Sequence, residues 1–542
     1  MDEIAIWESA SASIILPVVL LFVFVLFLSL QEKYGRESHL NLSDKKHNWQ
    51  CVSDFTKSYR CSGCHTLLVK GVVCDTCGLS ADAPCMNKVG ASFVCKEVSL
   101  DSQQPFKHRW IGGNFPIEVG CEVCSEDYSK DWKWKRCIWC HKTVHIRCQL
   151  FLGEVCDFGK LRQVIIPPTH VEISKKKSRM VRGGFKLRSI SDPNISDWSP
   201  VFVVANKSSG SQAADEILSR FRSLFNPLQT LELSSHSLKR LVFILTLLPQ
   251  SCKPIILIAG GDGTVASVIT LLYKNRKNIK CDFRVGIVPL GTGNDLSRVL
   301  GWGKEESTPF SAHQMLNKLL TSTPLSMDRW EVNIVQGRRL GISRPAQVKF
   351  MYNYMSVGVD ARVTLDFHNA RNSSLYLGGR LINKALYLAF GTQQVVDRVC
   401  IGLEKKIEVE LDGLKIQLPE LEAVVILNIA SWGAGCHVWE LKEPDEHISE
   451  QSMSDGKLEV IGIYSSFHMA QMQVGLSSPY RIGQASNVKI ILKTREPMQM
   501  DGEPWMQSPC VVEVKFGGQV TVLKAPEDTQ EEAGDETMSK EF

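Results

Sequence analysis

The chain has 542 residues, of which 44% are hydrophobic and 22% charged, so it is long enough for roughly three or four folded domains and too apolar to be disordered throughout. Its 62 basic and 58 acidic residues leave a formal net charge of +4, a surplus too small to indicate nucleic-acid binding. The 18 cysteines are concentrated between Cys51 and Cys156, which predicts a disulfide scaffold or metal binding in that segment.

An apolar run, Ile14 to Leu30, lies near the N-terminus and is long enough for one membrane-spanning helix of about 20 residues. A cleaved signal peptide is the alternative, but acidic residues precede the run and bulky residues end it. Basic residues follow the run, namely Lys33, Arg36, Lys45 and Lys46. We expect residues 1–32 to anchor a single-pass protein in an endomembrane, with the endoplasmic reticulum as the first expectation. By the positive-inside rule, the C-terminal body should be cytosolic. Cytosolic thiols stay reduced, which favours zinc over disulfides.

Residues 108–156 have the spacing of a module with two tetrahedral zinc sites. Their eight candidate ligands are His108, Cys121, Cys124, Cys137, Cys140, His145, Cys148 and Cys156. Six thiolates and two imidazoles suffice for two Cys3His sites. The spacing resembles the phorbol-ester/diacylglycerol-binding zinc module, and this resemblance implies interleaved sites. One site would then use His108, Cys137, Cys140 and Cys156, and the other would use Cys121, Cys124, His145 and Cys148.

Residues 47–95 repeat this order less strictly and predict a first, degenerate zinc module. Its candidate ligands are His47, Cys61, Cys64, Cys74, Cys77, Asp82, Cys85 and Cys95. Asp82 takes the place of the second histidine, and a carboxylate is a less usual zinc ligand beside thiolates. We interpret this copy as structural. Lipid binding by either module stays open, because relatives of the module with altered loops serve as scaffolds.

A polar, basic segment follows at residues 157–197 and is expected to be a linker. Its lysine run, Lys175 to Lys177, is a candidate for contact with anionic lipid, and the alternative is a solvated linker. In residues 198–325 apolar strands alternate with helical patterns, which predicts an α/β domain with a parallel sheet.

Residues 326–525 contain crowded strand patterns and a hairpin signal at Asp412-Gly413, which predict a mostly antiparallel β domain. A helical insertion is expected at residues 373–390, and the acidic tail at 526–542 is expected to be disordered. The predicted fold class is thus an α/β nucleotide-binding domain and a mostly antiparallel β domain, preceded by a transmembrane helix and two small zinc modules.

The stretch "AGGDGTVASVI", residues 259–269, places a glycine turn between a strand and a helix. A Walker loop is excluded because no Gly-Lys-Ser/Thr follows. A dinucleotide fingerprint matches from Gly261 to Ala266, with Asp282 further on, but Asp262 would bring a carboxylate near the pyrophosphate. We favour a nucleotide turn in which the acid acts on magnesium bound to ATP or on an incoming hydroxyl.

A second loop, "GTGND" at residues 291–295, again follows a strand and combines glycines, a hydroxyl and an acid. A third stretch, "DGEPW", places Asp501 and Glu503 at a turn. Together with "DFHNAR", "GGRLINKALY" and "DGKLEV", these motifs resemble the eukaryotic diacylglycerol kinase family, in the membrane-anchored plant layout. The first loop, "VANKSSG", departs from the N-P-K-S-G pattern of that family, so Asn206 and Lys207 match it only loosely.

The resemblance implies transfer of the γ-phosphoryl group of ATP to the free hydroxyl of 1,2-diacylglycerol, a membrane lipid, to give phosphatidic acid in lipid signalling and glycerolipid metabolism. It implies catalytic roles for Asp262, Glu503 and Asp295, and magnesium contacts for Asp328 and Asp455, whose alternative reading is ordinary turn aspartates. The implied ATP-binding residues are Gly260, Gly261, Gly263, Thr264, Gly291, Thr292, Gly293 and Asn294. Sphingosine or ceramide kinase chemistry and a non-catalytic membrane scaffold built on the zinc modules are the alternatives, and no nucleic-acid partner is expected.

Overall fold

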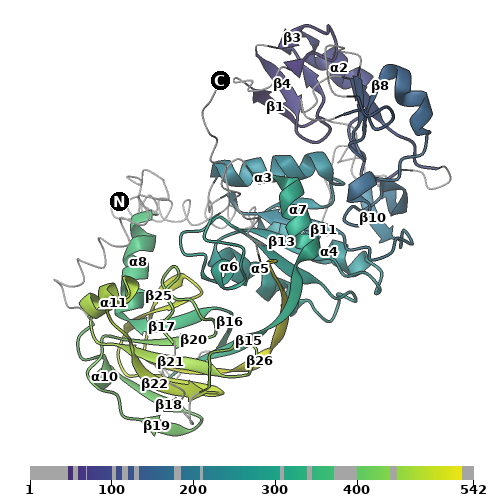
Figure 1. Ribbon diagram of the computed structural model, residues 1–542. Coiled ribbons are helices and arrows are strands. Elements are labelled where there is room, and N and C mark those ends of the chain that lie inside the picture. The colour runs from purple at the N-terminus through teal and green to yellow at the C-terminus, as the bar shows by residue number, and fades with distance from the viewer. Residues whose placement is uncertain are drawn as a thin grey trace, which may run out of the picture.

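The structure is a computed structural model of the chain (Figure 1). It describes residues 47–527, with gaps at 53–58, 69, 101–104, 113–119, 127–133, 176–184, 208–210, 306–309, 338–344, 372–399 and 440–448.

The two cysteine-rich modules are small sheets with short helices and lie together at one end of the molecule (Figure 1). The elements of the first are β1 (Trp49–Val52), β2 (Tyr59–Arg60), β3 (Leu67–Leu68), β4 (Gly71–Cys74), β5 (Ser80–Ala81), η1 (Ala83–Cys85) and α2 (Met86–Ser92). Those of the second are β6 (Trp110–Gly112), β7 (Trp134–Cys137), β8 (Thr143–His145) and η2 (Ile146–Leu152). Cysteines occupy much of each interior, and Cys61, Cys74 and Cys137 are fully buried. Such small cores depend on bound metal for stability.

The segment expected to be a linker is folded over much of its length. It contains η3 (Gly159–Leu161), η4 (Pro168–His170) and an antiparallel hairpin of β9 (Val171–Lys175) and β10 (Phe185–Ile190). Ile165 and Ile166 are fully buried, and the backbone N–H of Ile166 donates to Gln229 Oε1 at 2.8 Å. This segment therefore packs against the domain that follows. Most of the predicted lysine run lies outside the described residues.

The α/β domain has four parallel strands in the order β12-β11-β13-β14. Their bounds are β11 (Val201–Ala205), β12 (Thr230–Glu232), β13 (Ile255–Gly260) and β14 (Arg284–Pro289). The helices are α3 (Ser211–Leu224), α4 (Ser235–Leu247), α5 (Asp262–Lys274), α6 (Asp295–Val299) and α7 (Ala312–Thr321). Every residue of β11 and β13 is buried, as expected for central parallel strands. The predicted parallel sheet is confirmed.

Two long strands, β15 (Thr323–Gln336) and β26 (Cys510–Lys524), join this domain to the next (Figure 1). They pair antiparallel over almost their whole length, and β26 also pairs parallel with β14 and antiparallel with β23. The parallel sheet therefore continues into the antiparallel domain as one ten-stranded sheet. The predicted boundary at residue 325 falls inside β15.

A second sheet of six antiparallel strands, in the order β22-β21-β20-β17-β24-β25, completes the antiparallel domain. The remaining strands are β16 (Gln347–Met351), β17 (Tyr354–Gly358), β18 (Ile407–Leu411), β19 (Leu414–Ile416), β20 (Ala423–Leu427), β21 (Leu458–Ile463), β22 (Tyr480–Ala485), β23 (Asn487–Leu492), β24 (Glu496–Met500) and β25 (Glu503–Gln507). The helices are α8 (Val359–Arg371), α10 (Leu403–Lys406) and α11 (Ser466–Gln473). Apolar side chains from both sheets, among them Trp330, Ile426 and Val512, form one buried core. The predicted antiparallel domain is confirmed.

The hairpin predicted at Asp412-Gly413 joins β18 to β19. Both residues have positive φ, 48° and 86°, as the tight turn between twisted strands requires.

The prediction of a single-pass membrane protein in an endomembrane is wrong by this structure. Within residues 47–527, the described part of the chain has no helix that is both long enough and apolar enough to cross a bilayer. The predicted anchor at residues 1–32 and the predicted insertion at 373–390 both lie outside the described residues. Helices α3 and α7, for example, are instead amphipathic.

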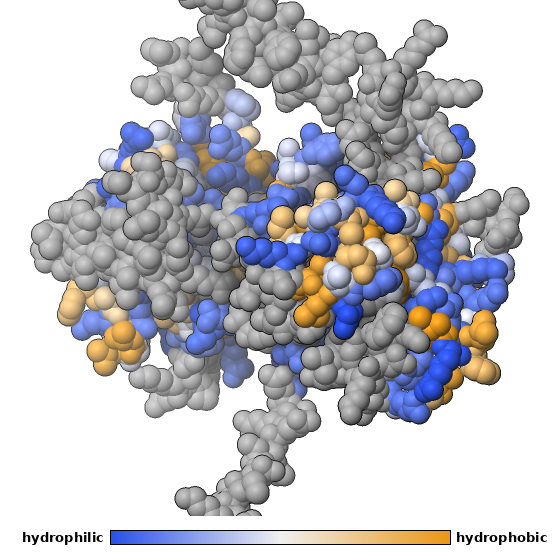
Figure 2. Space-filling model, turned by 90° about the horizontal axis from the view of Figure 1, so that it is seen from above, coloured by the Kyte–Doolittle hydropathy of each residue, from blue (hydrophilic) through white to orange (hydrophobic). Residues whose placement is uncertain are grey.

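Apolar side chains do reach the surface in places. Figure 2 shows hydrophobic residues gathered among hydrophilic ones on the face seen from above. In the second cysteine-rich module, Leu150 and Phe151 of η2 are 88% and 79% exposed.

Candidate functional site

The two glycine loops meet at the carboxyl ends of β13 and β14. These strands are neighbours, and Gly260 pairs with Pro289 at their ends. A Cβ added to Gly291 would lie 2.6 Å from the Cα of Gly261, so both positions require glycine. This close approach brings the second glycine loop against the N-terminus of α5, where a phosphate is favoured.

Two of the predicted nucleotide ligands hold these loops in shape. Asn294 is 1% exposed, and its Oδ1 accepts from the N–H of Gly291 while its Nδ2 donates to the carbonyls of Gly291 and Lys304. Thr264 is also buried, and its Oγ1 accepts from Asn206 Nδ2 at 2.8 Å. The loosely matched loop after β11 is thereby tied to the first glycine loop.

Asp262 is half-buried and attached to the start of α6. Its Oδ1 accepts from the N–H of Leu296 at 3.1 Å and from Asn353 Nδ2 at 3.0 Å, and its Oδ2 accepts from the N–H of Asp295 at 3.1 Å. Burial, followed by the charge of Asp295, raises the pKa of Asp262 to about 6, and these three hydrogen bonds oppose the rise. A carboxylate has about four lone-pair sites, so one site on Oδ2 remains for a substrate.

Asp295 is 1% exposed, and its carboxylate is bound by the antiparallel domain. Oδ1 accepts from Ser431 Oγ at 2.5 Å and from the N–H of Gly435 at 3.0 Å. Oδ2 accepts from Tyr354 Oη and from the N–H of Ala434, both at 3.2 Å. These four bonds use the acceptor capacity of the carboxylate. Asp295 thus joins the second glycine loop to the antiparallel domain.

The third motif reaches the first glycine loop from the turn between β24 and β25. Asp501 has a φ of 49° and is 2% exposed, and burial raises its pKa to about 7. Glu503 starts β25 and is exposed. A Cβ on Gly263 would lie 2.6 Å from Glu503 Oε1, so the glycine makes room for this carboxylate. The structure therefore brings all three sequence motifs together.

Asp328 and Asp455 lie elsewhere: Asp328 is inside β15, at the register shift against β26, and Asp455 is in the bend before β21. Asp328 is fully buried, and its carboxylate accepts from the N–H of Gly456 at 2.7 Å and from Gln519 Nε2 at 2.9 Å. Asp455 accepts from the N–H of Lys457 at 3.0 Å. Neither belongs to a cluster of three or more metal-ligating groups among the described residues. Their assignment to magnesium stays a prediction.

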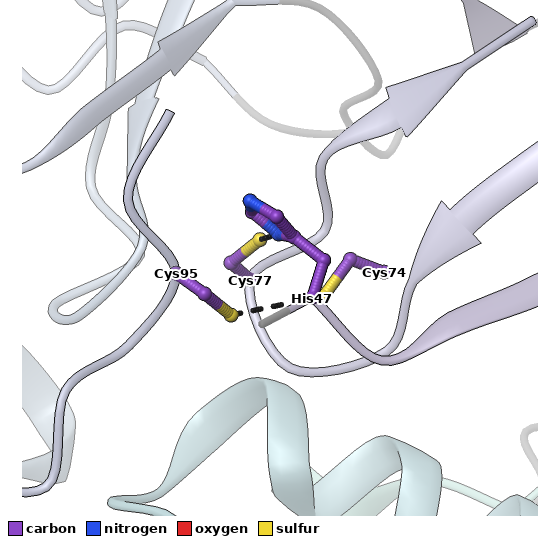
Figure 3. A group of neighbouring side chains, drawn as sticks. All are labelled: His47, Cys74, Cys77 and Cys95. Carbon is purple, nitrogen blue, oxygen red and sulfur yellow. Dashed lines mark hydrogen bonds between the residues drawn. The ribbon is translucent and has the colours of Figure 1, made fainter. Parts of the chain in front are cut away.

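Three complete ligand sets for zinc occur in the cysteine-rich modules. Two are the sets implied by the resemblance for the second module, namely His108, Cys137, Cys140 and Cys156, and Cys121, Cys124, His145 and Cys148. The third is His47, Cys74, Cys77 and Cys95, whose side chains point toward a common centre in Figure 3. Within each set the ligand atoms lie within 4.8 Å of one another, and all 18 cysteines are free. Tetrahedral Cys3His coordination fits this donor chemistry, whereas the disulfide alternative does not.

The fourth group of candidate zinc ligands has fewer members than the sequence predicts. Cys61, Cys64 and Cys85 lie together, and the carboxylate of Asp82 is not part of this group. Asp82 Oδ1 instead accepts from the N–H of Ala83 at 2.8 Å and caps η1. A short acidic side chain before a helix is a common N-cap, and that local role accounts for its position.

Comparisons with known proteins agree with this architecture. The sequence model of the diacylglycerol kinase catalytic domain matches residues 200–327, and that of the diacylglycerol kinase accessory domain matches residues 350–504. Together they match more than half of the chain, which therefore belongs to the diacylglycerol kinase family.

The individual relatives named here are less than 30% identical to the chain. The chain is 29% identical to "Probable diacylglycerol kinase 3" of Caenorhabditis elegans, over 89% of this chain and 64% of that protein. It is 28% identical to "Diacylglycerol kinase 2" of Arabidopsis thaliana, over 84% of this chain and 78% of that protein. It thus spans less than two thirds of the nematode relative. A solved diacylglycerol kinase from Bacillus anthracis is 14% identical, covering 60% of this chain and 97% of that one, with a TM-score of 0.35, too low to support an argument.

Sequence reasoning missed the residues of the antiparallel domain that hold the two loop aspartates. Asn353, Tyr354 and Ser431 contact Asp262 or Asp295 from positions at least 59 residues away in the chain. Their only signal was weak: Asn353 interrupts the apolar pattern of "FMYNYMSV" between two strands.

Proposed function

We propose that this protein is an ATP-dependent diacylglycerol kinase that converts 1,2-diacylglycerol to phosphatidic acid. The observation that carries the proposal is the meeting of three loops: Gly261 against Gly291, and Gly263 against Glu503. The family supplies the substrate class, since the relatives bear the name diacylglycerol kinase.

The nucleotide lies over the paired glycine loops. Helix α5 is a full-length helix, so the N–H groups of its first turn and its dipole favour phosphate binding at its N-terminus. Gly260, Gly261, Gly263, Gly291 and Gly293 allow backbone approach, while Thr292 can donate a hydroxyl hydrogen bond. Thr264 and Asn294 act less directly, by shaping the loops through their own hydrogen bonds.

Asp262 accepts the proton of the attacking hydroxyl. Its carboxylate is held in place with one lone-pair site free, and a pKa of about 6 leaves it ionised at neutral pH. The hydroxyl oxygen of the lipid forms a bond to the γ-phosphorus, and the bond from that phosphorus to the β–γ bridging oxygen breaks. The proton passes to Asp262 Oδ2, and ADP leaves.

Glu503 is the carboxylate best suited to magnesium. It is exposed and lies beside the first glycine loop, and hard carboxylate oxygens are typical Mg²⁺ ligands in kinases. When bound, Mg²⁺ neutralises phosphate charge. Asp295, whose four acceptor sites are used, positions the second loop rather than touching the substrate.

The three complete Cys3His sets hold structural zinc. Zinc contributes folding free energy to modules whose cores are this small. The modules are also attached to the kinase domains through buried contacts, so we assign them a structural role in the enzyme.

A lipid kinase assay tests the function. Purified protein is incubated with labelled ATP, Mg²⁺ and micelles that contain diacylglycerol, sphingosine or ceramide, and the labelled lipids are separated. We expect phosphatidic acid as the main product, and its loss on Asp262→Asn in protein that remains folded. Labelling of sphingosine or ceramide alone would show that the substrate class is wrong. Absence of any labelled lipid from folded protein would support the scaffold alternative.

A further inference from the structure

Asn353 lies between β16 and β17 and is 2% exposed. Its Nδ2 donates to Asp262 Oδ1 at 3.0 Å. Since an ionised carboxylate only accepts hydrogen bonds, the amide orientation is fixed, with Nδ2 toward Asp262 and Oδ1 directed elsewhere. Oδ1 is buried and has no hydrogen-bond partner within the described ranges. A buried carbonyl without a hydrogen-bond partner is unfavourable. If the side chain served only to fill this space, an apolar residue would therefore be expected here.

The backbone around Asn353 is fixed by the third motif. Asp501 Oδ1 accepts from the N–H of Asn353 at 2.8 Å and from that of Tyr354 at 3.3 Å, and its Oδ2 accepts from the N–H of Tyr352 at 3.0 Å. Asp501 is two residues before Glu503 in the same turn. Asn353 therefore connects the turn that carries Glu503 to the carboxylate of the first glycine loop.

We propose that Asn353 is a positioning residue for the phosphoryl transfer, holding Asp262 Oδ1 through its amide so that the free lone pair of Oδ2 meets the acceptor hydroxyl. This inference rests on the proposed function for its kinetic consequences, but the contact itself does not. It also gives the antiparallel domain a part in the reaction, because Asn353 reaches Asp262 from outside the α/β domain.

The charges around Asp262 determine what the loss of the Asn353 amide would do. The charge of Asp295 at α6 raises the pKa of Asp262, and Asp501 and Glu503 at the β24–β25 turn are further acidic groups on its other side. The Asn353 amide opposes this rise by donating to the ionised form. Without that amide, the pKa of Asp262 moves further up, and the carboxylate is held only by the backbone N–H groups of Asp295 and Leu296.

The test uses two variants. Asn353→Leu is nearly isosteric with the wild type, and Asn353→Ala keeps the proposal testable if the Asn353→Leu protein does not fold. Asn333→Leu is the matched control, because Asn333 on β15 also has a buried Oδ1 that is unpartnered among the described residues, and it lies opposite Val348 of β16 rather than beside the glycine loops. For both Asn353 variants we expect kcat on diacylglycerol to fall at least about tenfold, the KM for ATP to stay within about twofold, and the acid limb of kcat/KM to move to higher pH. Asn333→Leu should leave all three unchanged. A folded Asn353 variant with kcat within about twofold of wild type and an unmoved acid limb would overturn the proposal.

A substrate-free measurement separates this inference from the proposed function. The unfolding midpoints of Asn353→Leu, Asp262→Asn and the double variant form a cycle, and residues in contact give non-additive shifts. We expect non-additivity for this pair and additive shifts when Asn333→Leu replaces Asn353→Leu. If the wild type makes no phosphatidic acid while the cycle is non-additive, the proposed function fails and the contact stands. Additive shifts in an active enzyme would contradict the hydrogen bond on which the inference depends.

Discussion

Arg222 Nη1 lies 2.8 Å from Asp75 Oδ2 and joins the first zinc module to the α/β domain. Asp75 stands between the zinc-ligand candidates Cys74 and Cys77, and its side chain is 1% exposed. Arg222 is in the last turn of α3, the helix that follows the loop after β11. Nearby, Lys96 Nζ donates to the carbonyl of Ser223 at 2.6 Å. The first zinc module is therefore packed against the α/β domain.

Removing the charge of Asp75 should destabilise the protein. Asp75→Asn leaves the Arg222 guanidinium largely buried without its counter-ion, at a cost of about 1–3 kcal/mol. Glu216→Gln is the control, since Glu216 forms an exposed pair with Arg220 on the same helix, worth about 0.3–0.5 kcal/mol. Urea unfolding gives both values, and equal effects of the two variants would contradict the coupling.

Zinc should be required for the folding of the second module. Cys137→Ser removes a fully buried ligand of the set with His108, so the variant should contain one zinc less per chain and be cut by protease within residues 108–156. Cys252→Ser changes a buried cysteine outside the ligand sets and should keep its zinc. Metal analysis and limited proteolysis measure both. Wild-type protein without zinc would contradict the assignment.

The features that the sequence predicted well depend on residues close together in the chain. The strands β11, β13 and β14 follow from apolar runs, and their glycine loops follow directly on them. Cysteine and histidine spacing likewise predicted the eight ligands of the second module, and the resemblance implied how they divide into two sets. In each case the physical cause, burial of a strand or coordination of a metal, leaves a short-range pattern.

Features that were not predicted depend on partners far apart in the chain. Asp295 resembles a catalytic acid in "GTGND", but its acceptor sites are filled by residues from Tyr354 to Gly435. Asp82 occupies a ligand position by spacing, yet its carboxylate caps a helix. The sequence shows the same residue type, aspartate, for all these roles. Only the fold determines which hydrogen-bond donors reach its carboxylate.

A methyl group at Gly263 should interfere with Glu503. Gly263→Ala would place its Cβ 2.6 Å from Glu503 Oε1, closer than the atoms can approach, so the carboxylate must move away from the nucleotide. We expect kcat to fall about tenfold or more, since small displacements of catalytic groups are costly. Gly337→Ala is the matched control, because nothing lies within 4 Å of its Cβ position. Steady-state kinetics at saturating ATP compares the two, and equal activity would contradict the placement of Glu503.

Activity should fall as the pH drops through about 6. Burial and the charge of Asp295 raise the pKa of Asp262 to about 6, and the base function is lost when the carboxylate is protonated. The acid limb of kcat/KM for diacylglycerol, measured from pH 5 to 8, should therefore bend near that value. A profile without an acid limb in this range, in protein that remains folded, would exclude Asp262 as the base.

Replacement of Asp295 should shift that limb in the direction opposite to replacement of Asn353. Asp295→Asn removes the nearby charge that raises the pKa of Asp262, so the acid limb should move to lower pH. It also weakens the bonds from Ala434 and Gly435, each of which loses a charged acceptor, so stability should fall by about 1–3 kcal/mol. Steady-state kinetics across pH and urea unfolding measure the two effects.

Tyr354→Phe separates charge from hydrogen bonding at Asp295. It removes one bond to the carboxylate at 3.2 Å and leaves the negative charge, so it should lower stability slightly without moving the acid limb. If Asp295 contacted the substrate as a catalytic acid or base, Asp295→Asn would abolish turnover at every pH and no shifted limb would be observed. Residual activity with a limb at lower pH, together with an unmoved limb in Tyr354→Phe, is the result expected when Asp295 acts only through the loop it holds and the field it exerts on Asp262.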